Sequence, residues 1–195
     1  ATESVPVVEY NVMEGLDMAE LAAKAEHVGY RAVHNYVNSL APSNKNAYTG
    51  LLEGKNLILI TAEAFSKEVI DPQLTPTLYR MANEGIRFEE YYQPIWGAST
   101  TSGEFSNVVG LVPTTGGKCM KEAIQQDLFL TMGNQLQEQG YFSRAYHNHL
   151  KDFYDRNKTH THLGYDKFLG LYGGLEGVFM LAWLNVASLI TSINW

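Results

Sequence analysis

Residues 56–61 read NLILIT, and an acid, Glu63, follows two positions after the run. The run has no polar alternation and is too short for an independent helix, which is typical of a strand buried on both faces of a parallel sheet. Open α/β sheets bind ligands in the crevice outside the carboxyl ends of their strands. Glu63 is therefore either part of a site at that edge or a solvated carboxylate in a loop.

The residues after this run continue with a helix signal and a strand signal. Residues 74–85 predict one short crossover helix, with Thr75 as its N-cap, Pro76 at its first position and Gly85 as its terminator. Residues 86–91 alternate apolar and polar side chains, which suits a strand nearer the sheet edge. A helix between two strands indicates an α/β fold.

A polar cluster at residues 97–105, GASTTSGEF, follows the second predicted strand. We expect it to form a turn that opens a helix running through Val109. A hydroxyl at a helix N-terminus lies near free backbone N–H groups and the positive end of the dipole, which favour a phosphate or a developing oxyanion. By spacing alone, the alternative is that Ser99, Thr100 and Thr101 are only N-caps.

Two pairs of histidines have a spacing that suits a shared ligand. His147 and His149 lie two positions apart at the end of a strand predicted over residues 141–147, so their side chains face the same way. His160 and His162 have the same spacing. His147 is the better site candidate because it ends a strand, and ordinary structural roles are the alternative for each pair.

The chain divides into three parts. Residues 1–55 predict a helical lead-in, because a capping-box pattern at 17–20 begins one helix and a second helical pattern covers 31–40. Residues 56–170 form the α/β domain. Residues 171–195 form an apolar tail, which we expect to be a packed terminal segment or sequence foreign to the fold; a membrane anchor suits it less, because its end is polar.

Composition narrows the class of protein. The chain has 195 residues, 45% of them hydrophobic, which is enough for one domain with a core of its own. Its formal charge is −7, from 14 basic and 21 acidic residues, and it has no Lys/Arg cluster, so we expect no nucleic-acid partner. The single cysteine, Cys119, excludes an internal disulfide.

Several motifs, in a fixed order, resemble the lipoteichoic acid synthase family, a branch of the alkaline phosphatase and sulfatase superfamily. The resemblance covers roughly residues 10–168, and the ordered set is far more specific than any one motif. It implies an alkaline-phosphatase-like α/β sheet flanked by helices, incomplete here, with 56–170 as the first part of the catalytic domain. The motifs are residues 55–63, 74–78, 83–86, 99–105, 146–149, 153–157 and 163–166.

The resemblance also implies a metal and a nucleophile. In that family the acid that ends the first strand binds a divalent metal, usually Mn²⁺ and alternatively Mg²⁺, and a Thr four residues before a Glu–aromatic pair is the nucleophile. These roles fall on Glu63 and on Thr100, which precedes Glu104 by that interval and also contacts the metal. Thr101 is the near competitor.

The substrate contacts follow from a third family motif. Its aromatic-x-Arg element, which contacts the phosphoglycerol group, matches Tyr154 and Arg156, although family members often have Trp at the first position. An Arg offers a planar fork of donors to phosphate oxygens, which a Lys cannot reproduce. His147 is the remaining candidate for substrate binding.

The resemblance implies a metal-dependent phosphoglycerol transferase on the outer, extracellular face of a bacterial membrane. It would act on a phosphatidylglycerol-like phospholipid or a teichoic-acid-type glycerol-phosphate polymer, through a phosphoglyceryl-threonine intermediate. Membrane contact would come through segments outside this chain. The alternatives are a related phosphodiesterase or sulfatase, and a catalytically inactive fragment or binding module.

We expect the chain by itself to be inactive. In the resembling family an Asp–His pair completes the metal shell, and that pair and a further substrate-binding His come from the later half of the domain. Here the last histidine is His162 and the last aspartate is Asp166. Hard divalent metals are held well only when several ligands converge, so we expect weak metal binding and no turnover.

Overall fold

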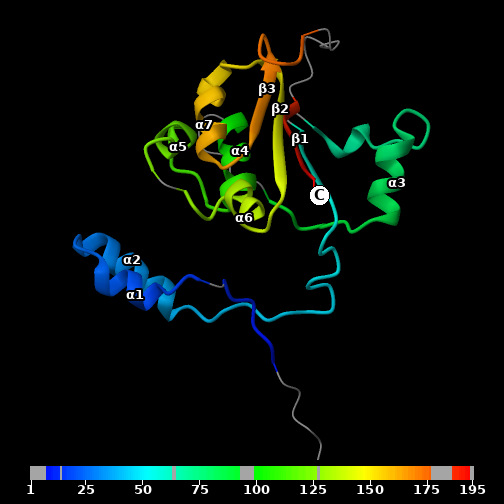
Figure 1. Ribbon diagram of the computed structural model, residues 1–195. Coiled ribbons are helices and arrows are strands. Elements are labelled where there is room, and N and C mark those ends of the chain that lie inside the picture. Colours follow the sequence, from blue (N-terminus) through cyan, green and yellow to red (C-terminus); the bar gives the residue numbers. More distant parts are fainter. Residues whose placement is uncertain are drawn as a thin grey trace, which may run out of the picture. The chain divides into compact units, whose positions relative to one another are not determined.

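The computed structural model describes residues 8–13, 15–62, 65–92, 99–126, 128–176 and 186–193 (Figure 1). The chain falls into two compact units, Ala1–Glu53 and Gly54–Trp195, which are described separately. Within the described ranges, no helix is both long enough and apolar enough to cross a membrane.

The first unit contains the two helices predicted for the lead-in. They are α1 (Met18–Lys24) and α2 (Val28–Ser39). The Asp17 side chain accepts hydrogen bonds from the backbone N–H groups of Ala19 and Glu20, as its place in the capping pattern predicts. Both helices expected within residues 1–55 therefore form.

The second unit is built on a mixed sheet of four strands in the order β1-β4-β2-β3. Strands β2 and β3 are parallel, whereas β4 runs antiparallel to both β1 and β2. The tail predicted to be a packed segment thus contributes a central strand, with Ile190 paired to Leu59 on one side and to Ala145 on the other. The strands are β1 (Leu57–Ala62), β2 (Phe142–Leu150), β3 (Lys167–Leu171) and β4 (Val186–Ile193).

Strand β1 forms where NLILIT predicted it, but its environment differs from the prediction. It is an edge strand of an antiparallel pair, and Ile58 and Ile60 are 63% and 56% exposed. Only Leu59 and Thr61 are partly buried. The expectation of burial on both faces is wrong for this chain, because an apolar run does not reveal whether its second face is covered by the same chain.

Two short 3₁₀ segments and five helices accompany these strands. Helix α3 confirms the helix predicted over residues 74–85, with Pro76 in its first turn and Gly85 as its C-cap, but it does not cross over to a second strand at 86–91. The strand predicted over 86–91 is wrong: these residues form no strand, and Ile86 and Phe88 are 76% and 75% exposed. The elements are η1 (Lys67–Val69), α3 (Pro76–Glu84), α4 (Ser99–Val109), α5 (Cys119–Ala123), α6 (Met132–Glu138), η2 (Phe153–Asp155) and α7 (Arg156–His162).

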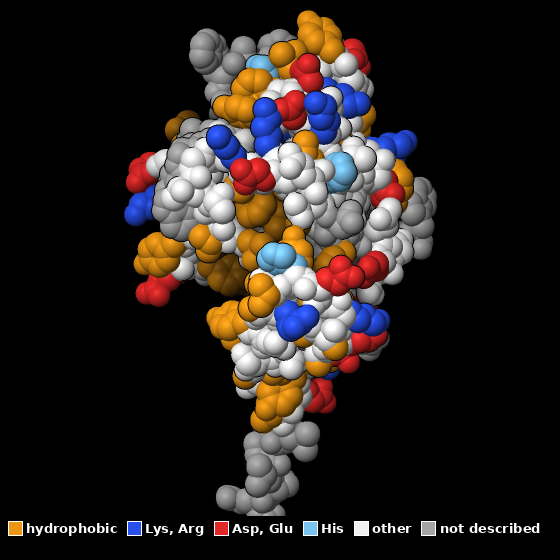
Figure 2. Space-filling model, turned by 90° about the vertical axis from the view of Figure 1, so that its left-hand side faces the viewer, with side chains coloured by type: hydrophobic (Ala, Val, Ile, Leu, Met, Phe, Trp, Pro, Cys, Tyr) orange, Lys and Arg blue, Asp and Glu red, His pale blue; other side chains and the backbone are white. Residues whose placement is uncertain are grey.

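The core lies between one face of the sheet and the helices α4, α5 and α7. Figure 1 shows α4 to α7 on one side of the strands and α3 on the other. Figure 2 shows basic and acidic side chains interspersed on the face that it draws. This mixed α/β arrangement confirms the predicted fold class. The buried apolar side chains are Phe105, Val108, Cys119, Met120, Ala123, Ala145, Leu163, Tyr165 and Phe168.

Candidate functional site

Helix α4 begins at the polar cluster and carries both threonine candidates in its first turn. The helix starts at Ser99, so Thr100 and Thr101 lie inside it and are not its N-caps. Thr100 is half-buried, whereas Thr101 is only 6% exposed, and its Oγ1 has no hydrogen-bond partner among the described residues. A buried hydroxyl without a partner is uncommon and is a candidate for contact with a ligand.

A buried cluster of charged side chains connects the second turn of α4 with α7. Arg156 Nε donates to both oxygens of Glu104, at 3.2 and 3.1 Å, and Arg156 Nη2 lies 2.9 Å from Glu104 Oε2. His160 Nε2 lies 3.2 Å from Glu104 Oε1. All three residues are 0% exposed. Glu104 is therefore a shared partner of two side chains on another helix.

Burial and charge act in opposite directions on Glu104. Burial alone would raise the pKa of this carboxyl, but the hydrogen bonds and charges of His160 and Arg156 outweigh it and hold the pKa below its ordinary value. Glu104 is consequently ionised at neutral pH, and it compensates the guanidinium charge of Arg156.

The backbone before Arg156 is unusual. Tyr154 and Asp155 have φ values of 59° and 57°, in the left-handed region that residues other than glycine rarely adopt. Asp155 pairs with Lys121 at 2.7 Å, and this pair lowers the pKa of the Asp155 carboxyl. The Cζ of Arg156 lies 5.3 Å from the centroid of the Tyr154 ring. Strained positions of this kind cluster at ligand-binding sites.

A small cavity of about 100 Å³ joins the two motifs. Its walls include Thr101 from α4 and Tyr154 from η2, which are 53 positions apart in the sequence. Lys121 also reaches this cavity. The structure therefore brings the threonine cluster together with the aromatic-x-Arg element, as the resemblance implies for a single site. The remaining walls are Gly117 and Met120.

His147 lies on the buried face of β2, and it does not end the strand as predicted, because β2 continues to Leu150. It is 3% exposed, its Nδ1 is 3.4 Å from the Leu150 carbonyl oxygen, and its ring stacks on Phe153 with 6.2 Å between centroids. Burial, aided by the charge of Arg156, lowers the pKa of His147 from 6.5 to about 4. His147 is therefore neutral at pH 7. The ring of His149 lies 6.1 Å away, which confirms that the two histidines face the same way.

The second histidine pair does not share a face. Residues 156–162 form a helix, in which two positions correspond to about 200° of rotation. His160 is accordingly buried, against Phe168, while His162 is exposed. The expectation of a ligand shared by His160 and His162 is wrong. The sequence pattern also did not reveal that Glu104 is the partner of His160.

The predicted metal site lies partly outside the residues that the structure describes. Glu63 lies outside them, and within the described ranges no group of three His, Cys, Asp or Glu side chains could hold a metal ion. Of the two predicted ligands, the structure describes only Thr100. A divalent metal therefore stays a prediction from the resemblance, with Glu63 and Thr100 as its expected contacts.

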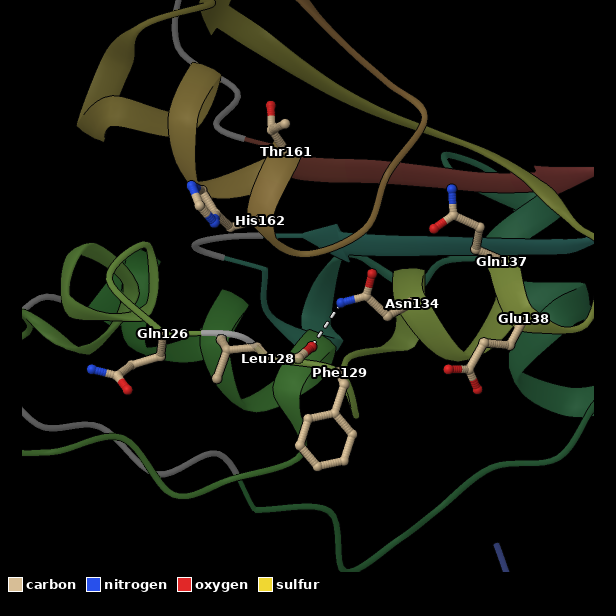
Figure 3. A pocket seen from close by; sticks show the side chains of 8 residues that line it. All are labelled: Gln126, Leu128, Phe129, Asn134, Gln137, Glu138, Thr161 and His162. Carbon is tan, nitrogen blue, oxygen red and sulfur yellow. Dashed lines mark hydrogen bonds between the residues drawn. The ribbon is translucent and has the colours of Figure 1, made fainter. Parts of the chain in front are cut away.

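A second, larger pocket lies elsewhere in this unit (Figure 3). Its volume is about 360 Å³, and it shares no lining residue with the small cavity. Its polar groups Glu138 and His162 are exposed, and the Asn134 amide donates to the Leu128 carbonyl 2.7 Å away. We therefore place the candidate site at the small cavity, where strained backbone and a buried hydroxyl converge.

Comparison with known proteins finds several relatives of this chain. The chain is 26% identical to lipoteichoic acid synthase 2 of Bacillus subtilis (strain 168) over 166 residues, covering 82% of the chain and 25% of that protein. It is 27% identical to lipoteichoic acid synthase 1 of the same strain over 173 residues, covering 82% and 27%. It is 26% identical to a lipoteichoic acid synthase of Staphylococcus saprophyticus over 170 residues, covering 82% and 26%.

The chain thus spans about a quarter of the length of these relatives. No solved structure matches it. The predicted resemblance to lipoteichoic acid synthases is confirmed. The family described as Sulfatase matches residues 55–178, which is more than half of the chain and includes α4, η2 and α7, and the chain therefore belongs to the Sulfatase family.

Proposed function

We propose that this chain is the first part of the catalytic domain of a metal-dependent phosphoglycerol transferase. The donor would be a phosphatidylglycerol-like phospholipid and the product a glycerol-phosphate polymer of the teichoic acid type, made at the outer face of a bacterial membrane. Relatives named lipoteichoic acid synthase support this reaction class. Membrane contact would come from segments outside this chain.

One observation carries the proposal. Thr101 and Tyr154 line the same cavity, although they come from distant motifs. Thr100, the proposed nucleophile, is the neighbour of Thr101 in the first turn of α4. A helix N-terminus favours the negative charge of a phosphate through its free N–H groups and its dipole. In this proposal, a phosphodiester bound in the cavity would lie beside the turn that carries Thr100 and Thr101.

The proposed chemistry proceeds in two steps. Thr100 Oγ1 attacks the phosphorus of the donor, the bond from phosphorus to the lipid oxygen breaks, and the lipid leaves as an alcohol after taking up a proton. The phosphoglyceryl group is then carried on Thr100 until the hydroxyl of an acceptor attacks the same phosphorus and releases the threonine. Covalent catalysis of this kind divides one difficult transfer into two easier ones.

Arg156 would contact the phosphate oxygens, and His147 would lie at the substrate. The guanidinium of Arg156 is buried, and the Tyr154 ring lies beside it at 5.3 Å and also lines the cavity. Access of a phosphate to Arg156 therefore requires the Tyr154 ring to shift. A neutral His147, with its lowered pKa, could accept a hydrogen bond or a proton.

Glu63 and Thr100 are the proposed metal contacts, with Mn²⁺ or Mg²⁺ as the ion. A divalent ion bound there would neutralise phosphoryl oxygens and lower the pKa of the threonine hydroxyl. The other ligands would come from outside this chain, as the share of the relatives that it spans suggests. By itself the chain is then expected to bind metal weakly.

The test is metal-dependent release of glycerol phosphate from a lipid diester. The protein would be a complete synthase carrying residues 55–176 in place of its own matching segment. Release that requires Mn²⁺ or Mg²⁺ and that fails in Glu63→Ala would support the proposal. Release of sulfate from an aryl sulfate instead would favour the sulfatase alternative, and no turnover of either compound would favour a binding module.

A further inference from the structure

The guanidinium group of Arg156 has two edges that can each bind an oxyanion, and one of them is already occupied. Its Nε and Nη2 face the Glu104 carboxylate at 2.9 to 3.2 Å, which is the side edge of the planar fork. On the other edge, Nη1 donates to the Phe153 carbonyl oxygen at 3.2 Å. Each terminal nitrogen carries two N–H groups, so a phosphate could approach only the edge that contains Nη1, through its second N–H and the outer N–H of Nη2.

The same carboxylate contacts a second residue on α7. Its Oε1 lies 3.2 Å from His160 Nε2, and the His160 ring is held by a stacking contact of 4.4 Å with Phe168. Glu104 is itself 0% exposed and lies four positions after Thr100. One side chain thus connects the turn that carries the proposed nucleophile with the helix that begins at Arg156.

We propose that Glu104 is a positioning residue, which fixes the plane of the Arg156 guanidinium so that only its Nη1 edge is presented to substrate. This inference rests on the proposed function of Arg156 in phosphate binding. An arginine on a long, rotatable stem would otherwise sample several orientations, and preorganised donors are more effective than mobile ones. In this role Glu104 acts through Arg156 and does not itself touch the substrate.

The first test uses the full 195-residue chain and NMR of its arginine side chains. We expect one Arg Nε–H resonance with slow solvent exchange, which Arg156→Lys removes and thereby assigns. Glu104→Gln should speed its exchange at least about tenfold, because the carboxylate that shields this donor is lost. The matched control, Glu138→Gln, changes an exposed carboxylate on α6 and should leave the resonance unaltered.

A second measurement needs no substitution, so it remains valid if Glu104→Gln does not fold. A through-hydrogen-bond coupling should connect Arg156 Nε to the side-chain carboxyl carbon of Glu104. Absence of this coupling, or unchanged Nε–H exchange in a folded Glu104→Gln chain, would overturn the proposal. A merely structural ion pair would also give this coupling, but it would not confine the effect of an added phosphate to the Nη groups of Arg156.

Glycerol phosphate, added to the same NMR sample, separates the proposed phosphate binding by Arg156 from its proposed orientation by Glu104. Chemical-shift changes at the Nη groups of Arg156, with the Nε resonance unchanged, would support both proposals. If glycerol phosphate leaves every Arg156 resonance unchanged while the coupling to Glu104 is present, then the function proposed for Arg156 fails and its orientation by Glu104 stands.

Discussion

At Glu104 and His147, the surroundings lower the pKa of a buried side chain below its ordinary value. Glu104 stays ionised although it is fully buried, because Arg156 and His160 compensate its charge. His147 stays neutral because burial and the Arg156 charge oppose its protonation. The buried cluster is therefore close to charge-balanced, because the Glu104 carboxylate offsets the Arg156 guanidinium and the His147 imidazole adds no charge.

His147 predicts a pH dependence of stability. Its pKa is about 4 in the folded chain and near 6.5 when unfolded, so the unfolded chain binds more protons between these values. Stability is therefore complete above about pH 6.5 and falls as the pH drops toward 4, by at most about 3 kcal/mol. Denaturant unfolding from pH 4 to 7 would measure this. A slope that is the same in His147→Gln would contradict the assignment.

Glu104 predicts a large loss of stability on truncation. Glu104→Ala leaves the Arg156 guanidinium buried without its carboxylate, which typically costs about 3–5 kcal/mol. Lys121→Ala is the matched control, because its ion pair with Asp155 lies at the surface and is worth about 0–1 kcal/mol. Urea unfolding of the two variants checks this. Equal, small losses in both would show that the buried cluster contributes little.

Among the elements, β1 pairs with β4 but keeps an apolar face exposed. Strand β4 lies between β1 and β2 and completes their hydrogen bonding, yet the outer face of β1 keeps Ile58 and Ile60 in solvent. Exposed apolar side chains on an edge strand are a common cause of self-association. The apolar run predicted that this face of β1 is covered. We expect other copies of the chain to make contact through it.

Substitutions on β1 should separate association from folding. Ile58→Lys together with Ile60→Lys places charges on the exposed face, so self-association should fall while stability changes by less than about 1 kcal/mol. Leu59→Lys, on the partly buried face, should destabilise the chain by several times that amount. Sedimentation velocity and urea unfolding report the two quantities. A doubly substituted chain that associates as strongly as the original would exclude this face as the contact.

For the molecule as a whole, local signals were predictable and long-range partners were not. The caps at Asp17 and Gly85 marked helices because capping depends on a few neighbouring residues. The strand predicted over 86–91 failed, since alternation does not supply a strand to pair with. Nothing local in residues 186–193 indicated a central strand.

At the candidate site, too, local signals were predictable from the sequence and long-range partners were not. The ordered motifs predicted Thr100, Tyr154 and Arg156 as site residues. In the structure, α4 and η2 meet at one cavity, and Arg156 Nε donates to Glu104 of α4. The partnership of Glu104 with Arg156 and His160 was not predictable, because the spacing of charged residues on two separate helices does not reveal which of them meet.

The central claim is that Thr100 attacks phosphorus, and a covalent adduct tests it most directly. A complete synthase carrying residues 55–176 in place of its own segment would be quenched during turnover of a phosphatidylglycerol donor and analysed by peptide mass spectrometry. We predict a glycerophosphoryl group on Thr100 that is abolished in Thr100→Ala and retained in Thr101→Ala, because nucleophilic attack requires that one hydroxyl. An adduct on Thr101, or no adduct in an enzyme that turns over, would contradict the account.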